Sequence, residues 1–272
     1  MACESSVRAE IGYTERTEKK PYFYANAHEK DYVPLKPAEM EIADARGLDT
    51  DLDREGFILV EHKSAVGDLT DLDAVVQVHA PEIAELLKQV TGCDHVEVMP
   101  RGILRFSERL GANDAHDNSN PARMAHVDMS KEAAAEARAK GAPEGKKVVR
   151  SAQYNVWRAV SGAPQDVPLA LCAYPSVQPQ DLIDCDAIFD PPGGAPEWSF
   201  GNYVIGHNPE HRWYYYSNMH PDEAIVFKTS ESDPTRAQLM PHGAFDNPLA
   251  PADSPPRVSL EMRGTCYWFE EN

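Results

Sequence analysis

Short runs of alternating hydrophobic and polar residues fill the second half of the chain. From residue 151 onward, Pro, Gly and Asp separate the runs QYNVWRAV, VPLALCAY, SFGNYVIG, RWYYYSN, EAIVFKT, RVSLEMR and TCYWFEE. Period-two alternation with turn residues between the runs is typical of β-sandwiches and barrels, and it argues against a βαβ fold. We therefore predict a strand in each run and a loop over DPPGGAPEWS (190–199).

Two earlier segments have helical periodicity. PEIAELLKQVTG (81–92) begins with proline, ends with glycine and places Ile83, Leu86, Leu87 and Val90 on one stripe. SKEAAAEARAKG (130–141) is rich in alanine and charge, with Ser130 as a candidate N-cap. We predict a helix with one buried face over 81–92 and a solvent-facing helix over 130–141. Between them, CDHVEVMP (93–100) alternates like a strand.

The length of the chain and the distribution of polar residues bear on its domain organisation. A chain of 272 residues is within the range of a single large β domain. Residues 1–75 are polar and charged, and aromatic residues gather in YFYANAHEKDYVP. We predict one domain over 1–272, in which 1–75 is an N-terminal extension packed on a catalytic core at 93–270.

Charge and cysteine content exclude several classes of partner. Lys and Arg number 26 against 44 Asp and Glu, a net charge of −18 that repels phosphate backbones and anionic membranes. The 5 cysteines are scattered and form no C-x-x-C pair, which favours a reducing compartment over a disulfide framework. The start of the chain has no apolar signal region. We expect a cytoplasmic protein without a nucleic-acid or membrane partner.

The stretch MAHVDMS places His126 and Asp128 two residues apart. In a strand, side chains at i and i+2 point to the same face, so this pair forms either a hydrogen-bonded structural pair or two of three ligands of a metal site. The structural pair is the commoner meaning of an isolated H-x-D. A 2-His-1-carboxylate site needs a second histidine from a distant strand. The downstream candidates are His207, His211, His220 and His242.

His242 differs from the other candidates because of the strand that follows it. Fifteen residues later, Arg257 and Ser259 share one face of the run RVSLEMR. A guanidinium beside a hydroxyl is suited to clamp a carboxylate. His95 and Glu97 are a weaker alternative, because CDHVEVMP is interpreted as a strand with a solvated polar face.

Other residues have candidate roles near such a site. The alternation in QYNVWRAV puts Asn155 and Trp157 on one face, where Asn155 needs a polar partner, for which a cosubstrate oxygen is a candidate. We predict Trp157, Trp213 and Tyr215 as apolar walls for a substrate. Arg105 and Arg109 are candidates to reach an anionic substrate, but we favour their interpretation as solvated surface residues.

Together these segments resemble a known enzyme family. AHVDMS, NVWRAV, DVPLALC, HRWYYYSNMHPDEAIVFK, PHGAFDNP and PPRVSLEMR, within about residues 93–263, are similar in content and order to the hydroxylase/desaturase family of Fe(II)/2-oxoglutarate-dependent oxygenases. That family includes a gibberellin desaturase and the cephamycin methoxylation-related proteins. Met129 and Ala159 depart from its usual residues, and VMPRGILR replaces a strand that contains histidine; these changes bear on the identity of the substrate.

The resemblance implies a mainly β protein with flanking helices, a double-stranded β-helix of the jelly-roll, cupin-like type. It implies metal ligands at His126, Asp128 and His242, with Arg257 and Ser259 holding the cosubstrate. The expected function is hydroxylation or desaturation of a small organic molecule in specialised metabolism, with Fe(II), 2-oxoglutarate and O2. A zinc hydrolase with the same three ligands and a non-catalytic small-molecule-binding barrel are the alternatives.

Overall fold

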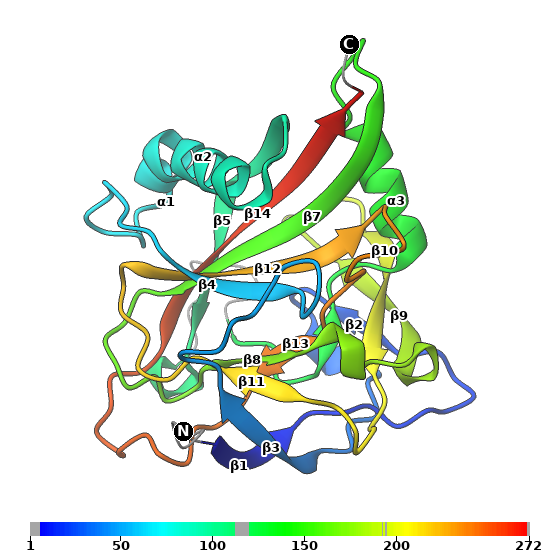
Figure 1. Cartoon of the computed structure of the whole chain (residues 1–272). Helices are drawn as coiled ribbons and strands as arrows, with labels where there is room; N and C mark the ends of the chain where they lie inside the picture. Colours follow the sequence, from blue (N-terminus) through cyan, green and yellow to red (C-terminus); the bar gives the residue numbers. More distant parts are fainter. Residues whose placement is uncertain (1–5, 112–119, 192, 194, 271–272) are drawn as a thin grey trace.

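Two β-sheets make up most of the molecule, with helices at their margins (Figure 1). The computed structural model describes residues 6–111, 120–191, 193 and 195–270. The larger sheet contains β1 (Ser6–Ile11), β2 (Tyr22–Tyr24), β3 (Ala38–Asp44), β6 (His126–Val127), β8 (Leu169–Cys172), β9 (Leu182–Phe189), β10 (Trp198–Ile205), β11 (Trp213–Tyr215) and β13 (His242–Ala244). The smaller sheet contains β4 (Phe57–Glu61), β5 (His95–Phe106), β7 (Val148–Ala159), β12 (Glu223–Glu231) and β14 (Val258–Phe269). The prediction of a mainly β protein with flanking helices is confirmed.

The strand order brings distant parts of the chain together. The larger sheet runs β1-β3-β11-β8-β13-β6-β10-β9-β2 and the smaller runs β4-β12-β7-β14-β5. Most neighbours are antiparallel, whereas β11 with β3 and β2 with β9 are parallel. Strands from the first 75 residues occur in both sheets.

Both predicted helices are confirmed. Helix α2 spans Ala80–Thr91 and ends at Gly92, whose φ of 67° is the left-handed conformation that favours glycine at a helix C-terminus. Helix α3 spans Lys131–Lys140, and the Ser130 hydroxyl accepts a hydrogen bond from the backbone N–H of Ala133. One face of α3 is buried through Ala134 and Arg138, so the helix is less exposed than predicted. The short α1 (Leu72–Ala74) leads through a π-helical turn, Val75–His79, into α2.

The predicted strands form, with two corrections to their limits. RVSLEMR and TCYWFEE are not separate strands, because β14 continues from Val258 to Phe269 through a register irregularity between Glu261 and Arg263. The predicted loop 190–199 is too long at its end, since β10 begins at Trp198; Pro192 and Gly194 lie outside the described residues. CDHVEVMP is a strand, and β5 extends it to Phe106.

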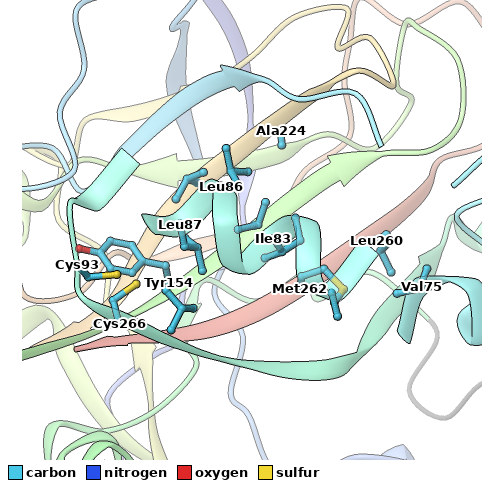
Figure 2. Packing of buried hydrophobic residues seen from close by; sticks show 14 of the residues in the cluster. Val75, Ile83, Leu86, Leu87, Cys93, Tyr154, Ala224, Leu260, Met262 and Cys266 are labelled. Carbon is cyan, nitrogen blue, oxygen red and sulfur yellow. The ribbon is translucent and has the colours of Figure 1, made fainter. Parts of the chain in front are cut away.

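Each face of the smaller sheet has its own hydrophobic cluster. On the outer face, Ile83, Leu86 and Leu87 of α2 pack against Tyr154 of β7 and Met262 of β14 (Figure 2). The opposite face meets the larger sheet, where Trp157, Ala159, Ile225 and Phe227 pack with residues such as Leu171. Alternation along β7 and β14 therefore sends even-numbered side chains to the helix and odd-numbered side chains between the sheets.

No helix within the described ranges is long and apolar enough to cross a membrane.

Candidate metal centre

His126, Asp128 and His242 converge between the sheets. The two histidines are paired residues of the neighbouring antiparallel strands β6 and β13, and their ring centroids are 4.4 Å apart. Asp128 lies two residues beyond His126, with its Oδ1 3.8 Å from Nε2 of His126. One ligand atom from each residue lies within 4.8 Å of the other two. Among the described residues this is the one such group of His, Cys, Asp and Glu found.

Backbone carbonyls orient both imidazoles toward the centre of this group. Nδ1 of His126 is 3.0 Å from the carbonyl oxygen of Met124, and Nδ1 of His242 is 3.1 Å from that of Met240. When Nδ1–H donates to these oxygens, each Nε2 keeps its lone pair for a metal ion. Burial, and then the neighbouring His242, lowers the pKa of His126 to about 4, so its ring is neutral at pH 7.

Asp128 is held in its ionised form by two hydrogen bonds. The Asn155 amide donates to Oδ2 at 2.7 Å, and Arg263 donates to Oδ1 at 3.0 Å. Burial opposes ionisation, but Arg263 and then the two histidines outweigh it and hold the pKa of Asp128 well below its usual range. Two imidazoles and one carboxylate form the donor set of a 2-His-1-carboxylate Fe(II) site. The residues present therefore fit that metal.

Ser259 lies on β14 and Arg257 immediately precedes that strand, and the two side chains lie together, as their spacing predicts. Nε of Arg257 donates to the Ser259 hydroxyl at 3.0 Å, and Nη1 donates to the carbonyl of Val167 at 2.8 Å. Within the described residues, Nη2 of Arg257 makes no hydrogen bond. Burial, followed by the nearby Arg105 and Arg123, lowers the pKa of Arg257 to about 9, and an incoming anion would relieve this destabilisation of the cation.

The predicted pocket residues fall into two groups. Trp157 lies between the sheets, with the Arg257 guanidinium 5.0 Å from its ring centroid. Trp213 and Tyr215 do not lie with the metal ligands. His242 pairs with Leu171 and Leu171 pairs with Tyr214, so Tyr214 shares the histidine face of the sheet. Its two neighbours point to the opposite face, where Trp213 donates to the Tyr13 hydroxyl.

The role expected for Asn155 also differs in the structure. Its amide donates to Asp128, so it orients a metal ligand here and no longer needs a cosubstrate oxygen as partner.

The alternative ligands lie in separate networks. His211 bridges Tyr13 and Asp181 through its two ring nitrogens, each contact being 3.0 Å. His95 pairs with Glu97 on the exposed face of β5. His207 contacts the Tyr13 ring, and His220 is exposed. None of these side chains belongs to the convergent group.

Sequence reasoning missed Arg263 and favoured the wrong environment for Arg105. Arg263 lies on the same face of β14 as Ser259. The period-two alternation of side chains along this strand is the sequence feature that places Arg263 near Asp128. Arg105 is opposite Ser259 in the register of β5 and β14, and its Nη1 is buried, which corrects its interpretation as a solvated residue. Arg109 is partly exposed and pairs with Asp166 at 3.2 Å.

Known proteins resemble this chain over most of its length. A family model described as "Oxidoreductase/YMDC permease-like domain" matches residues 11–267. The alpha-ketoglutarate-dependent dioxygenase phiK of Fungal sp. is 31% identical over 82% of this chain and 82% of its own length. The hydroxylase/desaturase CTB9 of Cercospora beticola is 31% identical over 81% of this chain and 72% of its own length.

A solved structure supports the fold independently. The iron and alpha-ketoglutarate-dependent endoperoxidase NvfI superposes with a TM-score of 0.83, covering 99% of this chain and 100% of its own, at 23% identity. At that identity the likeness shows the fold alone, and it confirms the predicted double-stranded β-helix.

Proposed function

The chain belongs to the family of Fe(II)/2-oxoglutarate-dependent dioxygenases that includes the fungal hydroxylase/desaturases; from this premise, we propose that His126, Asp128 and His242 hold its iron and that an unactivated carbon of a small organic molecule is hydroxylated or desaturated there. The observation that carries the proposal is the convergence of two imidazoles and one carboxylate within 4.8 Å. The relatives support this function, and they do not support the zinc hydrolase or the non-catalytic barrel.

The residues around the three ligands have distinct tasks. Bound Fe(II), with 2-oxoglutarate and O2, supplies the oxidant that removes hydrogen from a substrate carbon. Asn155 and Arg263 fix the carboxylate of Asp128, which in turn fixes the position of the metal. Arg257, with Ser259, supplies a buried cation for the distal carboxylate of 2-oxoglutarate. Trp157 covers that cation and excludes water from it.

Compartment and domain organisation complete the proposal. We infer a single oxygenase domain over 1–272, in which the described part of the N-terminal segment, residues 6–75, packs on the core through the pairing of β3 with β11, of β2 with β9 and of β4 with β12. We also infer a cytoplasmic location, because Cys93, Cys172, Cys185 and Cys266 are free thiols.

Metal retention and turnover in ligand variants test the proposed site. His126→Ala, Asp128→Ala and His242→Ala should each abolish iron retention and succinate formation, since two remaining ligands are too few. His220→Ala, an exposed histidine outside the site, is the control and should behave like the wild type. Iron content is measured after anaerobic loading and desalting. Full activity in His242→Ala would refute the assignment.

The oxidative outcome is read from products formed under labelled O2. Hydroxylation adds one labelled oxygen to the product, whereas desaturation removes two mass units. Candidate metabolites are incubated with the iron-loaded wild type and with His242→Ala as the inactive control. If no metabolite is oxidised and succinate never forms, the proposed function is wrong.

A further inference from the structure

Arg105, a partly buried arginine beside the metal ligands, has no hydrogen-bond or ion-pair partner among the described residues. Arg105 points inward from β5 opposite Ser259, and its Nη1 is buried without a hydrogen bond within the described residues. It interacts electrostatically with Glu261, Arg263 and Asp128, but no carboxylate of the described residues forms an ion pair with it. A buried charge without a partner is costly, and such groups are retained where a ligand supplies the partner.

The other charged groups of the site are already engaged. Arg263 donates to Asp128 at 3.0 Å and to Glu261 at 2.9 Å. Arg257 directs two donors to Ser259 and to a backbone carbonyl. Within the described residues, the open donors of these cations are therefore Nη2 of Arg257, which we assign to 2-oxoglutarate, and Nη1 of Arg105.

The charge balance of the site favours an anionic substrate. Among the described residues, Arg105, Arg257 and Arg263 face Asp128 and Glu261, so three positive charges meet two negative ones. The double charges of Fe(II) and of the 2-oxoglutarate dianion would cancel. One positive charge is therefore left when the cosubstrate is bound. In a site of low dielectric this charge attracts one further anion, despite the net charge of −18 of the chain.

Neighbouring charges do not remove this excess. Arg123 lies near Arg257, and it is bonded to Glu108 and Asp246 at 2.8–2.9 Å on the partly exposed side of the molecule. Those carboxylates are occupied and solvated, so they screen the buried Arg105 only weakly.

Aromatic side chains lie farther along the same face of the larger sheet, where Trp198 is 55% exposed. In β10, Val204 pairs with His126, so Phe200 and Trp198 alternate onto the face of His126. Phe189 of β9 stacks on Trp198 with ring centroids 4.2 Å apart. The ligand chemistry of this face is therefore an apolar skeleton that carries an anionic group.

We propose that Arg105 binds a carboxylate of the organic substrate, so that the enzyme selects apolar carboxylic acids over their neutral esters. This inference rests on the proposed function and deepens it. 2-Oxoglutarate also carries a carboxylate, but we assign its distal carboxylate to Arg257 and not to Arg105. A charge-assisted hydrogen bond of this kind changes affinity by about ten- to a hundredfold.

Binding to the anaerobic enzyme tests the proposal without turnover. Wild type loaded with Fe(II) and 2-oxoglutarate is titrated with 3-phenylpropanoate, 1-naphthoate and abietic acid, and with the methyl ester of each. Perturbation of the visible charge-transfer band reports binding. We expect the wild type to bind at least one acid about tenfold or more tightly than its ester. Arg105→Gln should lose that preference, and Arg101→Gln, an exposed arginine on the same strand, should keep it.

Two further measurements separate the alternatives. Arg105→Lys keeps the charge and should retain a preference for acids, which also guards against a folding defect in Arg105→Gln. The affinity for 2-oxoglutarate should change less than threefold in both variants. The inference is overturned if the wild type binds acids and esters equally, if Arg105→Gln keeps the preference, or if that variant loses affinity for 2-oxoglutarate and not for acids. In each of these cases the wild type and its variants still retain iron. If the proposed function itself is wrong, the wild type will not retain iron.

Discussion

The side chains around Asp128 show how a buried carboxylate is stabilised in this site. Its two oxygens accept hydrogen bonds from different elements, Asn155 on β7 and Arg263 on β14. An ionised carboxylate is expensive to bury alone, and these donors offset that cost while they fix its orientation. Two other buried cations, Arg158 and Lys228, point to the outer face of the smaller sheet and are engaged there. Arg158 donates to His62, and Lys228 donates to Asp53 and Glu231.

The affinity for 2-oxoglutarate tests the role of the single residue Arg257. A charge-assisted contact to a carboxylate contributes about 1.5–3 kcal/mol. Arg257→Ala should therefore raise the KM for 2-oxoglutarate about ten- to a hundredfold, since roughly 1.4 kcal/mol is a factor of ten. Iron content should stay nearly unchanged, and Arg101→Ala is the control. An unaltered KM would move the role to another cation, with Arg105 the first to examine.

Among the elements, β14 joins the core to the site. Its even-numbered side chains, Leu260, Met262 and Cys266, belong to the cluster beneath α2, as Figure 2 shows. The odd-numbered side chains from Arg257 to Arg263 point between the sheets and carry the charges of the site. The packing of α2 therefore sets the position of the strand that presents these charges.

Close packing at Gly264 tests this coupling between helix and strand. A Cβ at Gly264 would lie 2.4 Å from Cδ1 of the fully buried Leu87. Gly264→Ala should lower the free energy of unfolding by about 1–3 kcal/mol through overpacking, and Leu87→Ala should lower it by about 2–5 kcal/mol through a cavity. The double variant should lose less than the sum of the two, because the new methyl fills part of the cavity.

Urea unfolding measures all three variants. Gly67→Ala is the matched control, since a Cβ there meets nothing within 4 Å. Strict additivity of the Gly264 and Leu87 substitutions would show that the two residues do not share this space.

For the molecule as a whole, stability should depend on pH through a buried histidine under α2. His79 is fully buried, with Nδ1 3.0 Å from Glu82 and no hydrogen bond to Nε2 within the described residues. Burial, and then the charge of Arg158, lowers the pKa of His79 to about 4, against the opposing effect of Glu82. Its neighbour His62 also has a lowered pKa.

The sign of the effect follows from proton binding. Between pH 6.5 and 4 the unfolded chain takes up a proton at His79 that the folded protein does not, so stability falls as the pH falls. From pH 7 to 5 the loss due to His79 should be about 2 kcal/mol. His79→Gln should show a smaller loss over this interval, because other groups titrate in both proteins. Equal slopes in urea unfolding would contradict the prediction.

Local sequence determined the features of this protein that depend on neighbours along the chain. The stop of α2 at Gly92, the cap of α3 at Ser130 and the shared faces of His126 with Asp128 and of Arg257 with Ser259 follow from backbone preferences and period-two alternation. The residues themselves left four histidines open as the second imidazole ligand. The Arg257–Ser259 strand that follows it favoured His242, and the family resemblance implied the full ligand set.

Tertiary structure decided what depends on strand register. Pairing of β13 with β6 brings His242 to His126, and pairing of β11 with β8 turns Tyr214, not Trp213 or Tyr215, toward the ligands. A shift of one residue reverses every side chain of a strand, and register is set by contacts between segments far apart in the sequence. The partly buried position of Arg105 could not be predicted from the sequence for the same reason, because it depends on which strands surround it.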